Sequence, residues 1–87
     1  MDFAALRNQN IQTTCRFLHT EAALGTTFAG LAKRYRENGN IERYEISKRN
    51  AQAALDAIDH FKGQLPDDLR VQIEARRAEL ADLISLL

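Results

Sequence analysis

Apolar residues recur at three- and four-residue steps through most of this chain, and that period is the strongest constraint on its fold. The pattern breaks most clearly at residues 38–40 (Asn-Gly-Asn) and at residues 63–66 (Gly-Gln-Leu-Pro). Ala and Leu dominate the apolar set, whereas Val occurs once, at Val71, and this bias favours helix over sheet. The sequence therefore predicts an all-α protein of three helices.

The middle helix is predicted over residues 41–62. Its apolar stripe comprises Ile41, Tyr44, Ala51, Leu55, Ile58 and Phe61. Asn40 can cap this helix by accepting hydrogen bonds from its first free amides. Gly63 can end it in a left-handed conformation, and Pro66 lies shortly beyond. We expect Leu55 to belong to the core.

The last helix is predicted over residues 67–86. Asp67 and Asp68 stand in its first turn, where the helix dipole favours negative charge. Its apolar stripe comprises Leu69, Ile73, Leu80, Leu83, Ile84 and Leu87. We expect Leu80 to be a core residue.

The first helix is predicted over residues 14–37, preceded by a helical extension at residues 2–13. Asn and Thr side chains at residues 8–14 compete with helical hydrogen bonds, so the sequence leaves two alternatives for the extension: continuity with the long helix, or a kink or detachment there. The apolar period passes through Gly25 in phase, which places this glycine inside the helix. Small residues on the same face (Ala22, Ala29 and Ala32) predict the close approach of another helix.

Residues 38–40 have the composition of a tight connection between helices, with a glycine able to adopt positive φ followed by an N-cap. A phosphate-binding loop would need several glycines after a strand. We therefore expect one helical domain over residues 1–87, an antiparallel three-helix bundle with a long N-terminal helix.

The residues around this corner resemble a tetratricopeptide hairpin. The matching positions are Phe28, Leu31, Ala32, Tyr35, Gly39 and Asn40. Tyr44 and Lys48 depart from that family, which has a small residue and an aromatic residue there. The layout over residues 17–87 also resembles the microtubule-interacting-and-transport domain, a three-helix bundle. Both resemblances imply binding of partner helices rather than catalysis.

The overall charge gives no sign of a particular partner. Twelve basic and twelve acidic side chains cancel, so no global field draws the chain to nucleic acid or to anionic membranes. A lone cysteine, Cys15, suits a reducing compartment, and neither a signal peptide nor a membrane span is recognisable. We expect a soluble, cytoplasmic protein that does not bind membranes.

Two clusters of titratable residues deserve a chemical hypothesis. Cys15 and His19 stand four residues apart and could share a metal, but a zinc site needs three or four ligands. Asp56, Asp59 and His60 could form an acid–base group, but no nucleophile accompanies them. We expect neither an enzyme nor a cofactor, and a Cys15–His19 metal protein remains an alternative.

The function favoured by these observations is a small interaction or scaffolding module that binds a partner helix or itself. Its candidate partner-binding residues are Leu69, Ile73, Leu80 and Leu83, which would shape a groove, and Arg34 and Arg36, which would supply charge at the rim. Basic residues outnumber acidic ones over residues 33–49, which makes a nucleic-acid-binding regulator the other alternative.

Helix lengths predict self-association. A helix over residues 2–37 would be ~54 Å long, whereas its two partners would reach only ~30–33 Å. The candidate self-association residues Phe3, Leu6 and Ile11 would then project beyond the bundle. A second copy could cover them, which predicts a homodimer. The alternative is a break at residues 8–14 that folds residues 2–8 back onto the bundle.

Overall fold

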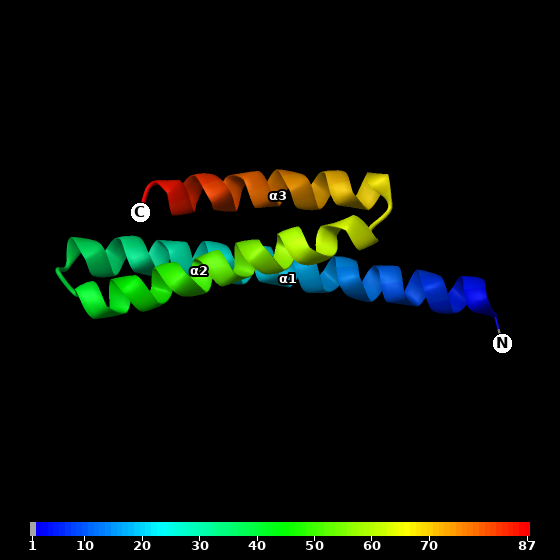
Figure 1. The fold of residues 1–87 in the computed structure, drawn as a ribbon, viewed down its shortest axis with the longest axis horizontal. Helices are drawn as coiled ribbons and strands as arrows, with labels where there is room; N and C mark the ends of the chain where they lie inside the picture. The colour runs from blue at the N-terminus through cyan, green and yellow to red at the C-terminus, as the bar shows by residue number, and fades with distance from the viewer. Residues whose placement is uncertain (1) are drawn as a thin grey trace.

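The computed structural model describes residues 2–87, and its elements are α1 (Phe3–Glu37), α2 (Ile41–Phe61), the 3-10 turn η1 (Lys62–Gln64) and α3 (Asp67–Ser85). Figure 1 shows that the chain turns back at both connections and that the N-terminal part of α1 extends beyond the other helices. The molecule measures 56 × 21 × 15 Å. The prediction of an all-α protein with three helices is confirmed for the described residues.

The connection between α1 and α2 forms as the sequence predicts. Gly39 has a φ of 76°, a conformation that other residues rarely adopt. The Asn40 amide donates to the Tyr35 carbonyl, which closes the end of α1. The Asn40 side chain then accepts from the Arg43 amide, which caps the start of α2. Three residues therefore end one helix and begin the next.

Of the two alternatives for residues 8–14, the structure has the continuous helix, because α1 is one helix of 35 residues. The Asp2 carboxylate accepts hydrogen bonds from the amides of Ala4 and Ala5, so the first turn is capped. The Thr13 hydroxyl donates to the Gln9 carbonyl one turn earlier, an arrangement that is compatible with the helix. The alternative in which residues 2–8 fold back onto the bundle is therefore excluded.

The end of α2 differs from expectation. Among the described residues, Gly39 is the only glycine with positive φ, so Gly63 does not end α2 in a left-handed conformation. Instead α2 runs into η1, and the Leu65 amide donates to the Lys62 carbonyl. Leu65 is buried at 3 % exposure, so this turn brings an apolar side chain into the core before α3 begins.

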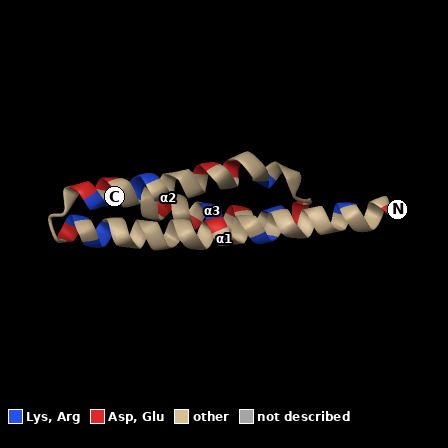
Figure 2. Cartoon of the chain, turned by 90° about the horizontal axis from the view of Figure 1, so that it is seen from below, with Lys and Arg blue, Asp and Glu red and all other residues tan. Residues whose placement is uncertain are grey.

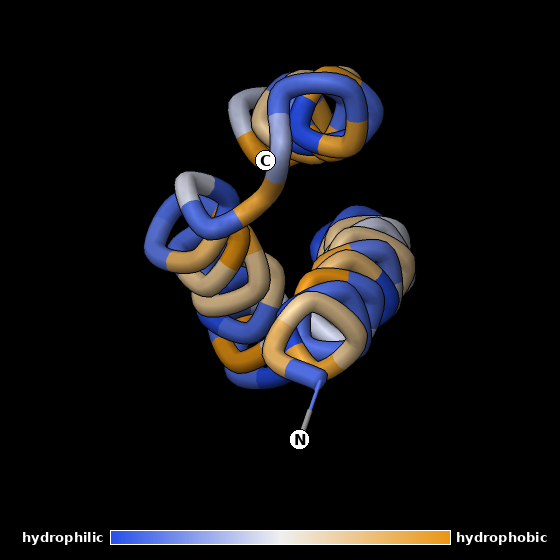
Figure 3. Tube along the Cα trace, turned by 90° about the vertical axis from the view of Figure 1, so that its right-hand side faces the viewer, coloured by the Kyte–Doolittle hydropathy of each residue, from blue (hydrophilic) through white to orange (hydrophobic). Residues whose placement is uncertain are grey.

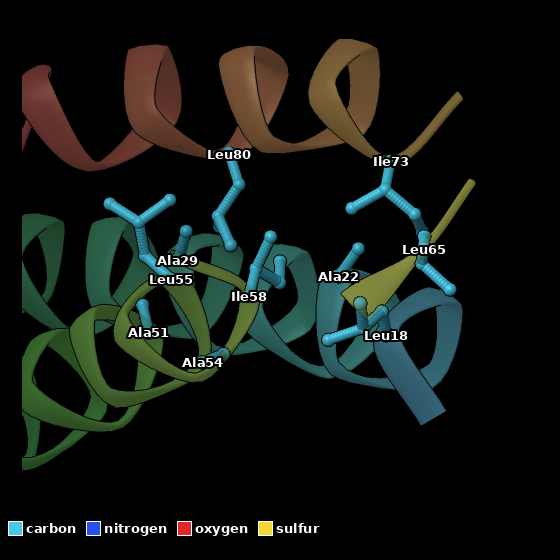
Figure 4. Packing of buried hydrophobic residues seen from close by; sticks show 10 residues of the cluster. All are labelled: Leu18, Ala22, Ala29, Ala51, Ala54, Leu55, Ile58, Leu65, Ile73 and Leu80. Atoms are coloured by element: carbon cyan, nitrogen blue, oxygen red, sulfur yellow. The ribbon is translucent and has the colours of Figure 1, made fainter. Parts of the chain in front are cut away.

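The core lies where α3 crosses the hairpin formed by α1 and α2. Its members are Leu18, Ala22, Ala29, Ala51, Ala54, Leu55, Ile58, Leu65, Ile73 and Leu80 (Figure 4). The hairpin contributes mostly small residues, so the three backbones can approach one another closely. Gly25 is buried at the centre of this contact: a Cβ atom there would lie 2.6 Å from Leu80 Cδ2 and 3.0 Å from Ala54 Cβ. The predicted helical, close-packed position of Gly25 is confirmed.

Candidate interaction surfaces

The stripe of α3 that we expected to form a partner groove is largely used by the chain itself. Ile73 and Leu80 are 0 % exposed and point from α3 into the hairpin (Figure 4). Leu69 is half-buried and packs against the same cluster. Only Leu83 is substantially exposed, at 39 %. Ile73 and Leu80 are therefore core residues and cannot line an open groove, whereas the prediction that Leu55 and Leu80 are core residues is confirmed.

The two arginines expected at the rim of that groove have different environments. Arg36 Nη1 donates to the main-chain oxygens of Leu86 and Leu87, at 3.1 and 2.7 Å. Its guanidinium lies 6.0 Å from the ring of Tyr44, whose hydroxyl also donates to Leu87. Arg36 therefore holds the end of α3 against the hairpin. Arg34 is exposed and belongs to none of the ion pairs formed by the described residues.

A small apolar pocket lies beside that anchor, between α1 and the end of α3. Its volume is about 290 Å³, and it is lined by Thr26, Ala29, Gly30, Lys33, Arg36, Leu83, Leu86 and Leu87. Two of the predicted partner-binding residues line it: Leu83 from the predicted groove and Arg36 from its predicted rim. This pocket is short, because the Arg36 contacts close its end near Leu87.

A longer apolar surface lies on the side of the hairpin that α3 does not cover. Figure 3 shows α3 seated over one side of the two longer helices. Phe17, Leu24 and Ile46 on the hairpin are 41 %, 45 % and 47 % exposed, and Phe28 and Leu31 are half-buried. We call these five residues the outer face. Large side chains exposed along a continuous stripe are typical of an interaction surface.

A groove of about 540 Å³ lies at the corner end of the outer face. It is lined by Phe28, Tyr35, Asn40, Glu42, Arg43, Ile46, Ser47 and Asn50. The guanidinium of Arg43 lies 5.8 Å from the Tyr35 ring, and its Nη1 donates to the Tyr35 hydroxyl at 3.4 Å. This hydrogen bond raises the pKa of Arg43. An arginine side chain is protonated at neutral pH in any environment, so Arg43 places a positive charge at one end of the groove.

The outer face was not predicted from the sequence because two stripes run side by side on α1. The core stripe consists of Leu18, Ala22, Gly25, Ala29 and Ala32, and the outer stripe consists of Phe17, Leu24, Phe28 and Leu31. The two stripes are offset by roughly 100° around the helix. Phe28 and Ala29 are adjacent in the sequence, and each belongs to a different stripe. The signal was present in the spacing of Phe17, Leu24 and Leu31, which are seven residues apart.

The N-terminal residues form a true overhang, but a shorter one than expected. Phe3 is 76 % exposed and Leu6 is 45 % exposed. Ile11 is half-buried and packs against the core cluster, at a shallow pocket shared with Leu65 and Pro66. The contact of Phe17 with Phe61, with ring centroids 5.8 Å apart, marks how far back α2 reaches along α1. Ile11 therefore belongs to its own bundle.

Asp59 of α2 forms an ion pair that helps to hold α3 against the hairpin. Asp59 accepts two hydrogen bonds from Arg77, at 2.7 and 3.0 Å, and lies 3.2 Å from Lys62. Lys62 in turn lies 3.0 Å from Glu74. The hydrogen bond from Arg77 lowers the pKa of the Asp59 carboxyl below that of an ordinary aspartate. An ionised carboxylate fixed by two cations is suited to holding helices together rather than to moving protons.

The Cys15–His19 pair gains no further ligand in the structure. Cys15 packs against the core cluster, and His19 Nδ1 lies 3.0 Å from Arg76 Nη1. A guanidinium can only donate, so Nδ1 accepts this hydrogen bond and faces a positive charge. Over residues 2–87, no group of three or more His, Cys, Asp and Glu side chains could hold a metal ion.

The basic corner is interspersed with acidic residues (Figure 2). Three of its cations lie against tyrosine rings: Arg36 and Lys48 over Tyr44, and Arg43 over Tyr35. These contacts order the side chains without clustering them into one stripe of positive charge.

Comparisons with protein-family models, with curated proteins and with solved structures each found no match for this chain. Within the described residues, no helix combines the length and apolarity that crossing a bilayer requires.

Proposed function

We propose that this protein is a small, non-catalytic interaction module whose outer face binds a helix. The observation that carries this proposal is the row of large side chains along the hairpin, of which Phe17, Leu24 and Ile46 are exposed and Phe28 and Leu31 are half-buried. Leaving a large apolar side chain in water is unfavourable by ~1.5–3 kcal/mol relative to burying it, so a cover is favoured. Binding a helix in a groove between two helices is also what the tetratricopeptide-like resemblance of the hairpin implies.

The rest of the molecule supports a scaffold role. The inner side of the hairpin is closed by α3, which is held by the Asp59–Arg77 pair and by the Arg36 contacts with Leu86 and Leu87. The outer face therefore stands on three mutually packed helices. A surface on rigid elements is better suited to recognition than one on loops. We place this activity in the cytoplasm, where a lone, half-buried Cys15 is compatible with reducing conditions.

Leu24→Glu tests the proposal, because it puts a charge in the middle of the outer face. The matched control is Val71→Glu on α3, since Val71 is also an exposed apolar residue, at 67 %. The immobilised wild type and both variants would be exposed to native lysate and the retained proteins compared. We expect capture to be lost in Leu24→Glu and kept in Val71→Glu. Capture of the same proteins by Leu24→Glu as by the wild type would contradict the proposal.

The basic corner supports the alternative of nucleic-acid binding only through its local charge excess. Titration with random-sequence DNA at two salt concentrations tests it. Salt-dependent binding that is unaffected by Leu24→Glu would favour that alternative over the helix-binding module.

A further inference from the structure

The outward-facing stripe of α1 has a spacing that is symmetric about Phe17, and the symmetry relates Asn10 to Leu24 and Thr13 to Glu21 as well as the larger apolar residues to one another. From Phe3 toward Phe17 the stripe advances by steps of three, four, three and four residues, and from Leu31 back to Phe17 the steps are the same. The positions on this stripe are Phe3, Leu6, Asn10, Thr13, Phe17, Glu21, Leu24, Phe28 and Leu31. At 3.6 residues per turn all of them fall within a sector of roughly 80°. Such a stripe is complementary to itself when two copies run in opposite directions.

We propose that the occupant of the outer face is a second copy of this chain, paired antiparallel along α1 with the two-fold axis at Phe17. This inference rests on the proposed function and names its partner. Phe3 of one copy then faces Leu31 of the other, and Leu6 faces Phe28. The two Phe17 side chains meet at the axis. The overhang is thus covered by the outer face of the second copy, and not by a second overhang.

The length of α2 fits this register. The Phe17–Phe61 contact shows that α2 lies beside α1 only from about Phe17 onward. In the antiparallel pair, α2 of the second copy lies beside the overhang of the first copy, and this contact begins at the level of Phe17. The two α2 helices, one from each copy, therefore lie beside different stretches of the paired α1 helices and do not clash. Phe61 of each copy would join Phe17 in an aromatic cluster at the axis.

The charges at the two ends of the stripe and the length of the overlap also agree with a second copy. Asp2 and Arg34 lie on the same edge of the stripe, at the two ends that this register brings together. Each Asp2 carboxylate would meet Arg34 of the other copy, and Arg34 belongs to none of the ion pairs among the described residues. The overlap from Phe3 to Leu31 is ~42 Å long. A specific dimer needs about 600 Å² from each copy, roughly a tenth of the 5900 Å² surface of the chain.

Distances between spin labels test the register in the full chain. In a Cys15→Ser background, a single cysteine would replace either Thr20 or Gln9, which are both exposed and lie at the edge of the stripe. With the axis at Phe17, the two Thr20 labels are offset along the helix by only ~9 Å and the two Gln9 labels by ~24 Å. Pairing of overhang with overhang about Leu6 would give ~42 Å for Thr20 and ~9 Å for Gln9. That reversed pattern, or equally short distances at both sites, would overturn the proposal.

Sedimentation equilibrium at micromolar concentration gives the mass, with Phe17→Glu as the disrupting variant and Val71→Glu as its control. We expect dimers for the wild type and Val71→Glu, and monomers for Phe17→Glu, because two glutamates would meet at the axis. A monomeric wild type that still captures another protein through Leu24 would refute self-pairing but leave the interaction module intact. A monomeric wild type whose capture of other proteins is unchanged by Leu24→Glu would refute both self-pairing and binding through the outer face. If Phe17→Glu fails to fold, the label distances on the folded chain still decide.

Discussion

The two sides of the α1–α2 hairpin use opposite kinds of side chain. The inner side, under α3, is built largely from small residues such as Ala22, Gly25 and Ala29, and it is almost fully buried. The outer face carries the larger Phe17, Leu24 and Phe28 and is partly open. Small residues let the three backbones pack closely, whereas large residues extend the area that another molecule can contact. The difference indicates that stability is concentrated on one side and recognition on the other.

The largest expected effect is at the centre of the inner side. Leu80→Ala removes a side chain with 0 % exposure that packs on Gly25 and leaves a cavity. We expect the free energy of unfolding to fall by ~2–5 kcal/mol. Urea unfolding followed by circular dichroism measures it. Loss of less than ~0.5 kcal/mol, the usual effect of a surface change, would place the core elsewhere.

The next effect separates two glycines of the same helix. A Cβ at Gly25 would lie 2.6 Å from Leu80 Cδ2, whereas a Cβ at Gly30 meets nothing within 4 Å. We expect Gly25→Ala to destabilise by ~1–3 kcal/mol through overpacking, and Gly30→Ala to stabilise by up to ~1 kcal/mol through helix propensity. Thermal melts of both variants provide the test.

A double variant identifies the cause of the Gly25 effect. In a Leu80→Ala background the close contact is gone, so the added cost of Gly25→Ala should shrink or change sign. An unchanged cost would mean that Ala54, whose Cβ is the other close neighbour at 3.0 Å, carries the strain.

These cases also show what the sequence could predict. The corner at Gly39, the position of Gly25 within a helix and the burial of Leu55 and Leu80 followed from local chemistry and from periodicity. Periodicity does not say whether a stripe faces its own chain or a partner, so Ile73 and Leu80 were also assigned to an open groove. Local propensity left a break at residues 8–14 open as an alternative, but the Asp2 cap and the Thr13–Gln9 hydrogen bond accompany an uninterrupted helix.

A smaller effect concerns the ion pair that holds α3 on the inner side. Because Arg77 lowers the pKa of Asp59 in the folded state, the pair contributes its full stabilisation above the ordinary aspartate pKa of ~3.9, which applies to the unfolded chain. This contribution is lost as the pH falls from there through the lowered pKa of the folded state. The groups are partly exposed, so we expect only ~0.2–1 kcal/mol. Asp59→Asn should remove this part of the difference in stability between pH 7 and pH 3. Asp56→Asn, whose amide oxygen can still accept the hydrogen bond from Gln52, should retain it.

The smallest effect on the monomer is expected on the outer face. Leu24 is 45 % exposed, so Leu24→Asn should change the stability of a dilute sample by no more than ~0.5 kcal/mol. If a second copy covers this side chain, the melting temperature of the wild type rises with protein concentration, because association stabilises the folded state by mass action. Leu24→Asn should weaken that dependence, while Val71→Asn on α3 should leave it unchanged. Melts recorded over a hundredfold range of concentration measure both slopes. A cost of several kcal/mol at high dilution would mean instead that Leu24 supports its own bundle, and the division between an inner side for stability and an outer face for recognition would be wrong.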